Sequence, residues 1–264
     1  MPEGHSIRHL ATVHSYGFVG TQIKASSPQG RFSEGASVIS GREMTETSAH
    51  GKHLFLHFDK DIVHIHLGLY GWFTTRKNKG QVAKDSIRLR IVNEDFVSDL
   101  VGPTACEIFS LEGMKLKINK LGPDPIHDDA DPEKAWTKIH KSSRSIGGLL
   151  MDQSIIAGIG NVYRAELLFL SKLSPFIEGK NLDKEKFDNV WKESVRLLKL
   201  GSEDGKIKTV EHAHLYDDEV RSHGCAQTSY VYKRAGSPCR VCSTVLMSDT
   251  LDGRTLYWCP SCQR

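Results

Sequence analysis

Four cysteines near the end of the chain have the spacing of a zinc site. They form two C-x2-C pairs, Cys239 with Cys242 and Cys259 with Cys262, separated by 16 residues. Tetrahedral Zn²⁺ accepts four thiolates, and each short pair supplies two of them from one turn. In a chain that we expect to be cytosolic, this spacing indicates a metal site rather than disulfides. Because four thiolates leave no open position on the metal, we expect one structural zinc ion and no organic cofactor.

The residues between the two cysteine pairs fit a two-stranded ribbon. Strands are expected over residues 244–247 and 255–258, with Asp252-Gly253 as the hairpin turn. Arg254 directly follows that turn. Two interpretations stay open from spacing alone: the ribbon is only a structural staple, or Arg254 points at a phosphate or a reacting group.

The start of the chain is a second candidate for chemistry. Removal of the initiator methionine would expose Pro2, a secondary amine whose pKa lies near that of an α-amino group, roughly 8. Such an amine can attack an aldehyde-level carbon and form an iminium. Glu3 beside it could act as a general acid or base. Many proteins begin with Met-Pro-Glu, so this pair needs support from other motifs.

A third motif is the glycine turn Gly158-Ile159-Gly160-Asn161, which opens a helix. Glycines allow the backbone to approach a ligand closely, and a helix N-terminus favours anions. We expect Asn161 to be the N-cap, and it could also contact phosphate. Two helices joined in this way position many proteins on duplex DNA, although an ordinary helical hairpin has the same pattern.

Around these motifs, the chain divides into a β-rich part and a helical part. After a helix over residues 1–15, alternating apolar and polar residues predict short antiparallel strands up to about residue 120. The prolines of Gly122-Pro123-Asp124-Pro125 interrupt that pattern, and helical periodicity follows. We therefore predict an α+β chain with an antiparallel sandwich or barrel up to about residue 120, a helical part after it and a zinc module over the last 34 residues.

Composition excludes several classes of protein. The chain has 264 residues, of which 39% are hydrophobic and 25% are charged, as in an ordinary globular protein. It contains no apolar run long enough to span a membrane and no secretion signal, so we expect a cytosolic protein. The net charge of +3 is too small to indicate nucleic-acid binding. Residues 231–264 carry that whole excess, with five basic and two acidic side chains.

In order along the chain, these motifs resemble one known family. The resemblance covers Pro2-Glu3-Gly4, Gly51-Lys52 before a strand hairpin, the segment from Leu149 to Glu166 with its glycine turn, and the four-cysteine ribbon. This set is similar to the formamidopyrimidine-DNA glycosylase / endonuclease VIII family of base-excision repair enzymes. The resemblance implies an α+β chain with an N-terminal catalytic domain over 1–120, built of a helix and a β-sandwich, a helix–two-turn–helix DNA-binding domain over 130–225 and a zinc ribbon over 230–264. It also implies a bifunctional DNA glycosylase and abasic-site lyase, a monomer in the bacterial cytosol or nucleoid, whose partner is duplex DNA containing oxidised bases or abasic sites.

The resemblance assigns a role to each matching residue. Pro2 would be the nucleophile at C1′, Glu3 the acid/base, and Lys52 a cation near the flipped sugar and its phosphates. Arg254 would hold the phosphates beside the lesion and assist elimination, and Asn161 would contact the DNA backbone. Elimination at the β and then the δ position would cut the strand and release the sugar remnant.

The turn Leu69-Tyr70 resembles the wedge with which endonuclease VIII fills the space left by a flipped base. The other branch of the family fills it with an arginine and a phenylalanine near residues 100–106, and this chain has neither residue there. The resemblance therefore favours oxidised pyrimidines. The alternatives are the same chemistry on oxidised purines, or a catalytically silent zinc-ribbon DNA-binding protein.

Some positions depart from the family pattern. His5 and Ser6 stand where relatives carry Pro-Glu, so a second carboxylate is missing, and Gly68 replaces a polar residue before the wedge. Lys120 stands where a phosphate-binding arginine is expected. The acidic run Asp217-Asp218-Glu219 could be a solvated loop or could contact the lesion. We expect Cys106 and Cys225 to be free thiols.

Four histidines, which share a strand face in pairs, allow two interpretations: a second metal site or a polar sheet face near DNA. They are His53, His57, His64 and His66.

Overall fold

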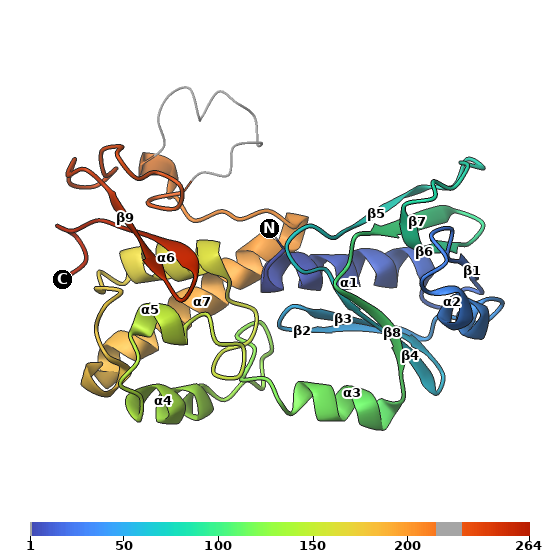
Figure 1. The fold of residues 1–264 in the computed structure, drawn as a ribbon, viewed down its shortest axis with the longest axis horizontal. Coiled ribbons are helices and arrows are strands. Elements are labelled where there is room, and N and C mark those ends of the chain that lie inside the picture. The colour runs from blue at the N-terminus through green and yellow to red at the C-terminus, as the bar shows by residue number, and fades with distance from the viewer. Residues whose placement is uncertain (1, 215–228) are drawn as a thin grey trace. The chain divides into compact units, whose positions relative to one another are not determined.

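The computed structural model describes residues 2–214 and 229–264, and these residues form two compact units (Figure 1). One unit ends at Lys120 and the other begins at Leu121. Asp217, Asp218, Glu219 and Cys225 lie outside the described residues. Among the residues described, no helix is both long and apolar enough to cross a membrane.

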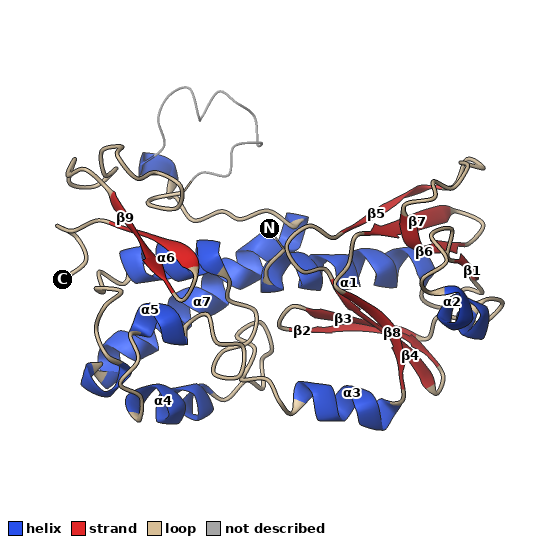
Figure 2. Cartoon of the chain, viewed as in Figure 1, coloured by secondary structure: helices blue, strands red, loops and turns tan. Residues whose placement is uncertain are grey.

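The first unit is a sandwich of two antiparallel sheets with a helix at its start, as predicted (Figure 2). Each sheet has four strands, in the orders β1-β6-β7-β5 and β2-β3-β4-β8. Three helices accompany them. The helices are α1 (Gly4–Phe18), α2 (Ser33–Ile39) and α3 (Leu111–Ile118). The strands are β1 (Lys24–Ser26), β2 (Glu46–His50), β3 (His53–Phe58), β4 (Asp61–His66), β5 (Trp72–Lys77), β6 (Ile87–Val92), β7 (Phe96–Val101) and β8 (Ala105–Phe109).

The alternation that predicted β3 also determines which of its faces meets the core. Leu54, Leu56 and Phe58 are fully buried in one apolar cluster with Leu89 of β6 and Ile7 of α1. The intervening residues of β3 point to the opposite face of the same sheet. There α3 packs against β4 and β8, so the histidines of this face are partly covered rather than fully solvated.

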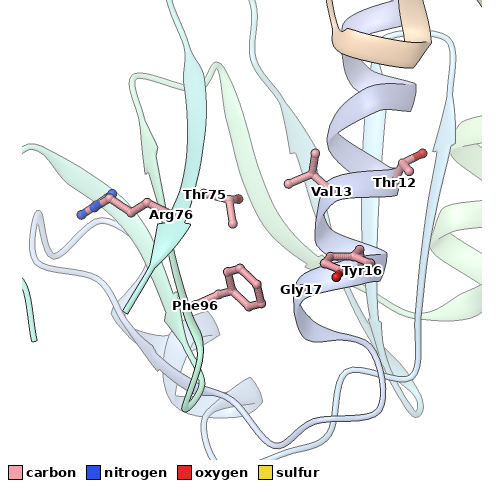
Figure 3. Close-up of a pocket in the computed structure, with 7 residues that line it drawn as sticks. All are labelled: Thr12, Val13, Tyr16, Gly17, Thr75, Arg76 and Phe96. Atoms are coloured by element: carbon pink, nitrogen blue, oxygen red, sulfur yellow. The ribbon is translucent and has the colours of Figure 1, made fainter. Parts of the chain in front are cut away.

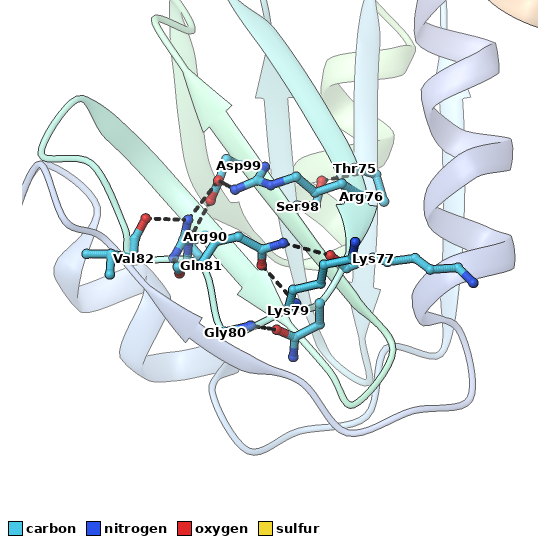
Figure 4. Close-up of polar contacts among 11 residues, drawn as sticks. Thr75, Arg76, Lys77, Lys79, Gly80, Gln81, Val82, Arg90, Ser98 and Asp99 are labelled. Carbon is cyan, nitrogen blue, oxygen red and sulfur yellow. Dashed lines mark hydrogen bonds and ion pairs between the residues drawn. The ribbon is translucent and has the colours of Figure 1, made fainter.

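An ion-pair network fixes the loop that follows β5 (Figure 4). Arg90 Nε lies 2.6 Å from Asp99 Oδ1, and Arg76 Nη2 lies 2.6 Å from Asp99 Oδ2. Burial would raise the pKa of Asp99, but hydrogen bonds from both guanidinium groups hold it below its usual value. Arg90 also donates to the carbonyl of Gln81 at 2.7 Å, which ties residues 78–82 to the sheet.

A cavity of about 370 Å³ lies between α1 and strands β5 and β7 (Figure 3). Its lining is Thr12, Val13, Tyr16, Gly17, Thr75, Arg76 and Phe96. None of the predicted catalytic residues is among them, so the cavity has no part in the chemistry expected of this chain.

The second unit consists of helices and the C-terminal ribbon. Its α-helices are α4 (Pro132–His140), α5 (Ile146–Leu149), α6 (Asn161–Leu170) and α7 (Lys184–Asp204). The described part of this unit also contains the 3₁₀ turns η1 (Gly179–Asn181) and η2 (His212–His214) and the ribbon strands β9 (Met247–Leu251) and β10 (Arg254–Trp258). The nine residues from Asn161 to Phe169 are all buried, so α6 is the central helix of this unit.

Two local predictions in the second unit were wrong. The first ribbon strand runs over Met247–Leu251 rather than 244–247. Its residues pair one to one with those of β10 on the other side of the turn, from Leu251 with Arg254 to Met247 with Trp258. The N-cap of α6 is Gly160, not Asn161. Asn161 is instead the first residue of the helix, and its side chain bonds to other partners.

Candidate active-site residues and zinc centre

Pro2 and Glu3 lie immediately before α1, with Glu3 as its N-cap. Ser6 fixes this start: its hydroxyl accepts from the Glu3 backbone N–H at 3.1 Å and donates to the Glu3 carbonyl at 2.8 Å. Glu3 is fully buried. Ser6, the departure from the family pattern, therefore has a local function, since it anchors the backbone directly beside Pro2.

Lys52 occupies the tip of the β2–β3 hairpin. His50 pairs with His53, so Gly51 and Lys52 form a two-residue turn, in which Gly51 adopts φ 56°. Such tight turns use glycine because other residues rarely adopt positive φ. Because α1 packs against β2 and β3, the hairpin turn and the beginning of α1 lie at the same end of the first unit (Figure 1).

The Leu69-Tyr70 turn begins at the same edge of the sheet. His66, the last residue of β4, pairs with His53, which follows Lys52. Burial and the nearby charges of His64, Lys52 and Lys117 lower the pKa of His66. Leu69 and Tyr70 are 44% and 83% exposed. A wedge requires exposed hydrophobic side chains such as these. Two exposed hydrophobic residues are common on a protein surface and destabilise the unbound protein little.

Gly68 is required by the shape of this turn. It adopts φ 68°, and a Cβ built there would lie 2.4 Å from the Thr104 side chain. The polar residue that relatives carry at this position does not fit here without a shift of Thr104.

In the second unit, the four cysteine sulfurs converge. All four lie within 4.8 Å of one another, with Cys239 Sγ 4.0 Å from Cys262 Sγ and Cys242 Sγ 3.5 Å from Cys259 Sγ. A tetrahedral ion with Zn–S bonds of about 2.3 Å requires sulfurs about 3.8 Å apart. The four thiolates therefore fit a single structural zinc ion.

The ribbon turn presents Arg254 to solvent. Asp252 and Gly253 both adopt positive φ, 49° and 70°, as a type I′ hairpin turn requires, so the predicted turn is confirmed. Arg254 itself is exposed. The turn is seated on α5, where Gly148 allows the Asp252 carboxylate to approach within 2.5 Å of the position that a Cβ would take.

Hydrogen bonds from α6 hold the strand that follows this turn. Asn161 donates its side-chain amide to the carbonyl of Thr255 at 3.0 Å, and Arg164 donates to the same carbonyl at 3.3 Å. Arg164 also donates to Asn161 Oδ1. On the exposed side, Arg144 lies 2.9 Å from Asp152 and 3.5 Å from Asp252.

Several of these supporting residues were missed in the sequence. The contact between the ribbon turn and α5 did have a signal in the sequence, the pair Gly147-Gly148. Glycines inside a helical segment commonly mark the close approach of another chain segment. Arg164 and Glu166 carried no such signal, because a charged residue in a helix is usually exposed. Glu166 is fully buried and accepts hydrogen bonds from Thr209 Oγ1 and from the backbone N–H groups of Tyr230, Val231 and Tyr232 at 2.7–2.9 Å.

Lys120, Cys106 and the histidines are the remaining residues singled out in the sequence. Lys120 is exposed at the end of the first unit, just after α3. Cys106 is a free thiol, and burial raises its pKa to about 12. Ring nitrogens of His53 and His64 hydrogen-bond to each other, which favours a polar network over a second metal site.

Residues 1–99 match the formamidopyrimidine-DNA glycosylase N-terminal domain, and residues 121–212 match the formamidopyrimidine-DNA glycosylase H2TH domain. The chain belongs to the formamidopyrimidine-DNA glycosylase / endonuclease VIII family. Full-length relatives support its endonuclease VIII branch. The protein named endonuclease 8 1 of Mycobacterium tuberculosis is 45% identical over 270 residues, and the match covers 100% of both chains. Endonuclease 8 of Pectobacterium atrosepticum is 27% identical, again over 100% of both chains.

Solved structures of the family share the fold. A Lactococcus lactis Fpg in complex with DNA containing an abasic site has a TM-score of 0.81, with 22% identity and 99% of each chain covered. A second complex of that protein, with DNA containing N7-benzyl-Fapy-dG, also has a TM-score of 0.81 at 22% identity. These similarities confirm the predicted fold class.

Proposed function

We propose that this chain is a base-excision repair enzyme that removes oxidised bases, with pyrimidines favoured, and then cuts the DNA strand at the resulting abasic site. Its partner would be damaged duplex DNA, bound by a monomer in the bacterial cytosol. The observation that carries the proposal is Glu3, a fully buried carboxyl group in the residue next to Pro2. A buried carboxyl group is costly, and active sites are where such groups are commonly kept.

In the proposed reaction, the Pro2 nitrogen lone pair attacks C1′ of the damaged nucleotide. The base leaves with the electrons of the glycosidic bond and takes up a proton. Glu3 assists opening of the sugar ring by proton transfer. The proton of the Pro2 amine passes to the departing base, and the proton that Glu3 gives to O4′ completes ring opening. The product is a cationic iminium between Pro2 and C1′, as expected for a secondary amine.

The iminium then makes strand scission easier, because it withdraws electrons from C2′. Loss of a C2′ proton expels the 3′ phosphate, and a second elimination expels the 5′ phosphate. Lys52 and Arg254 would stabilise the negative charge of these phosphates. Attack of water on the iminium then releases the sugar remnant and regenerates the Pro2 amine.

Other residues would bind and orient the DNA. Leu69 and Tyr70 would fill the space left by the flipped nucleotide, while Asn161 and Lys120 would contact the backbone. The zinc ion would hold the ribbon fold and take no part in the chemistry. The catalytic part would span residues 1–120, the DNA-binding part residues 130–225 and the ribbon residues 230–264.

Trapping of the iminium tests the proposal directly. The purified protein is incubated with abasic-site duplex and borohydride, which reduces the iminium to a stable covalent adduct. We expect an adduct with the parent protein, none with Pro2→Gly and much less with Glu3→Gln. A protein that binds the duplex but forms no adduct would be the silent DNA-binding alternative.

A substrate panel tests the branch assignment. Duplexes containing thymine glycol or 8-oxoguanine are cleaved under single-turnover conditions with the same protein. Faster cleavage of the thymine glycol duplex supports the pyrimidine preference, and the reverse order would place the chain with the purine-specific alternative.

A further inference from the structure

A row of hydrogen-bonded side chains runs across the outer face of the β2-β3-β4-β8 sheet. Glu107 Oε1 lies 3.0 Å from His64 Nδ1, and His64 Nε2 lies 2.8 Å from His53 Nδ1. The Glu107 side chain is half exposed, whereas His64 and His53 are 1% and 8% exposed. The row therefore starts at the surface and ends at the residue that directly follows Lys52.

The Glu107 carboxylate determines which group donates and which accepts in each hydrogen bond of the row. An ionised carboxylate only accepts, so His64 donates its Nδ1–H to Glu107. A neutral His64 then has an unprotonated Nε2, which accepts the Nδ1–H of His53. Each ring is thus held in its Nδ1–H tautomer by the next group, in the way that the partner of a catalytic histidine fixes its orientation.

Ring packing holds the same geometry. The His64 ring stacks on Phe109 with centroids 4.7 Å apart and on Phe55 at 5.3 Å. The His53 ring lies 4.8 Å from that of His66, across the strand pair. These contacts leave His53 little freedom to rotate, and since the turn Gly51-Lys52 ends at His53, they also limit movement of the turn.

Several charged and titratable groups surround the row. They are His50 and Lys52 on the hairpin, His66 on β4, Glu107 on β8 and Lys117 on α3. Burial, together with neighbouring His66, His64, Lys117 and His50, lowers the pKa of His53 to about 2. Burial also lowers the pKa of His64, although Glu107 opposes this. The imidazoles therefore add no positive charge beside Lys52.

We propose that Glu107, His64 and His53 are positioning residues for Lys52: the hydrogen-bonded row locks the β2–β3 turn so that the Lys52 ammonium is held in place for the phosphates of the flipped nucleotide. This inference rests on the role proposed above for Lys52. None of the three residues touches the reacting atoms in this scheme, and each acts through its neighbour.

The decisive test is a double-mutant cycle between the row and Lys52. His64→Phe keeps an aromatic ring against Phe109 but removes both hydrogen bonds. We expect single-turnover cleavage of abasic-site duplex to slow roughly 10- to 100-fold, as for other small misplacements of a charged group, with little change in duplex affinity. In a Lys52→Ala background the same change is expected to have almost no further effect, because the row acts only through Lys52.

Two further variants separate positioning from simple loss of folding. His64→Gln places an amide near the position of Nε2, which can still accept from His53, so we expect it to recover much of the rate. Glu107→Leu alters only the exposed end of the row and is the variant of choice if His64→Phe folds poorly. The matched control is His57→Phe, on the same face of β3 but bonded to Ser48 Oγ (2.9 Å) and not to the row; we expect it to cleave like the parent.

Nitrogen-15 NMR of the imidazoles gives a readout that does not depend on activity. His53 and His64 are expected as neutral Nδ1–H tautomers at pH 7, and Glu107→Leu is expected to change the His64 signal. Equal rates for His64→Phe and the parent, or multiplicative effects of His64→Phe and Lys52→Ala, would overturn the inference. A parent protein that forms no borohydride adduct would instead show that the proposed function itself has failed.

Discussion

The side-chain amide of Asn161 donates to the backbone carbonyl of Thr255 at 3.0 Å, and this bond joins the glycine turn before α6 to the strand that begins with Arg254. Asn161 is 7% exposed, and its Oδ1 accepts from the buried Arg164. One amide group thus joins the first residue of α6 to the base of the ribbon turn. Asn161 therefore supports the strand that begins with Arg254, in addition to the DNA contact proposed for it.

Replacing Asn161 by alanine is expected to lower both stability and activity. The change leaves buried groups of Arg164 and Thr255 with one partner fewer, which costs about 1–3 kcal/mol of unfolding free energy. Affinity for abasic-site duplex should fall as well, because Arg254 loses part of its support. Chemical denaturation and fluorescence anisotropy measure the two effects. Asn181→Ala, at an exposed asparagine bonded to Glu178, is the control, and equal behaviour of the two variants would contradict the role given to Asn161.

Tyr70→Ala is expected to impair base excision without affecting stability. Tyr70 is 83% exposed, so its removal changes the free energy of unfolding by less than about 0.5 kcal/mol. The flipped state of a duplex loses its support, so excision of thymine glycol from duplex should slow more than cleavage of a preformed abasic site in single-stranded DNA. Tyr16→Ala, at another exposed tyrosine of the same unit, should leave both rates unchanged. A similar loss on both substrates would argue against a wedge.

The stability of the first unit is expected to depend on pH through His14. This histidine is fully buried, with Nδ1 2.8 Å from the Leu10 carbonyl and Nε2 3.0 Å from Ser98 Oγ. Burial lowers its pKa to about 4 in the folded state, against 6.5 as the ordinary value. Between these two values the unfolded chain binds a proton at His14 that the folded protein does not. The contribution of His14 to the free energy of unfolding is therefore fully present above pH 6.5 and is lost as the pH drops towards 4.

The size of this effect follows from the pKa difference. A shift of about 2.5 units corresponds to roughly 3 kcal/mol lost across this pH range. Denaturation midpoints measured between pH 4 and pH 7 should show the loss in the parent protein and a flatter profile in His14→Phe. The exposed His140 gives the control His140→Gln, whose profile should follow that of the parent. A parent profile without any decline would show that protonation of His14 does not lower the free energy of unfolding.

The parts of this protein that could be predicted from sequence are those fixed by local pattern. Alternating Leu54, Leu56 and Phe58 predicted a strand with one buried face, and paired cysteines predicted the ribbon with its turn at Asp252-Gly253. Local pattern did not predict α3, nor the pairing that starts β9 at Met247. Nor could it predict that His64 would bond to Glu107, 43 positions along the chain, because such partners are determined by sheet register rather than by neighbouring residues.

Zinc is expected to hold the second cysteine pair against the helical core, and its removal should have effects beyond the ribbon. Gln263 accepts from the Cys259 backbone N–H at 2.8 Å and donates to the Leu173 carbonyl at 3.1 Å. Arg240, inside the first pair, donates to the carbonyls of Ser229 and His214 at 3.1 and 3.0 Å. Both links depend on the cysteine loops keeping their shape, which the four metal–sulfur bonds would fix.

The prediction for zinc is measured on the purified protein. Elemental analysis should give about one zinc per chain, since four thiolates fill one tetrahedral site. A strong chelator or Cys242→Ser should change the fluorescence of Trp258, which precedes Cys259 and lies edge-on to Phe176 at 5.1 Å, and should weaken duplex binding. Cys106→Ser is the control, because that thiol belongs to the first unit and is not one of the four clustered cysteines. A protein free of zinc with unaltered Trp258 fluorescence and unaltered duplex affinity would show that the cysteines hold the ribbon without a metal.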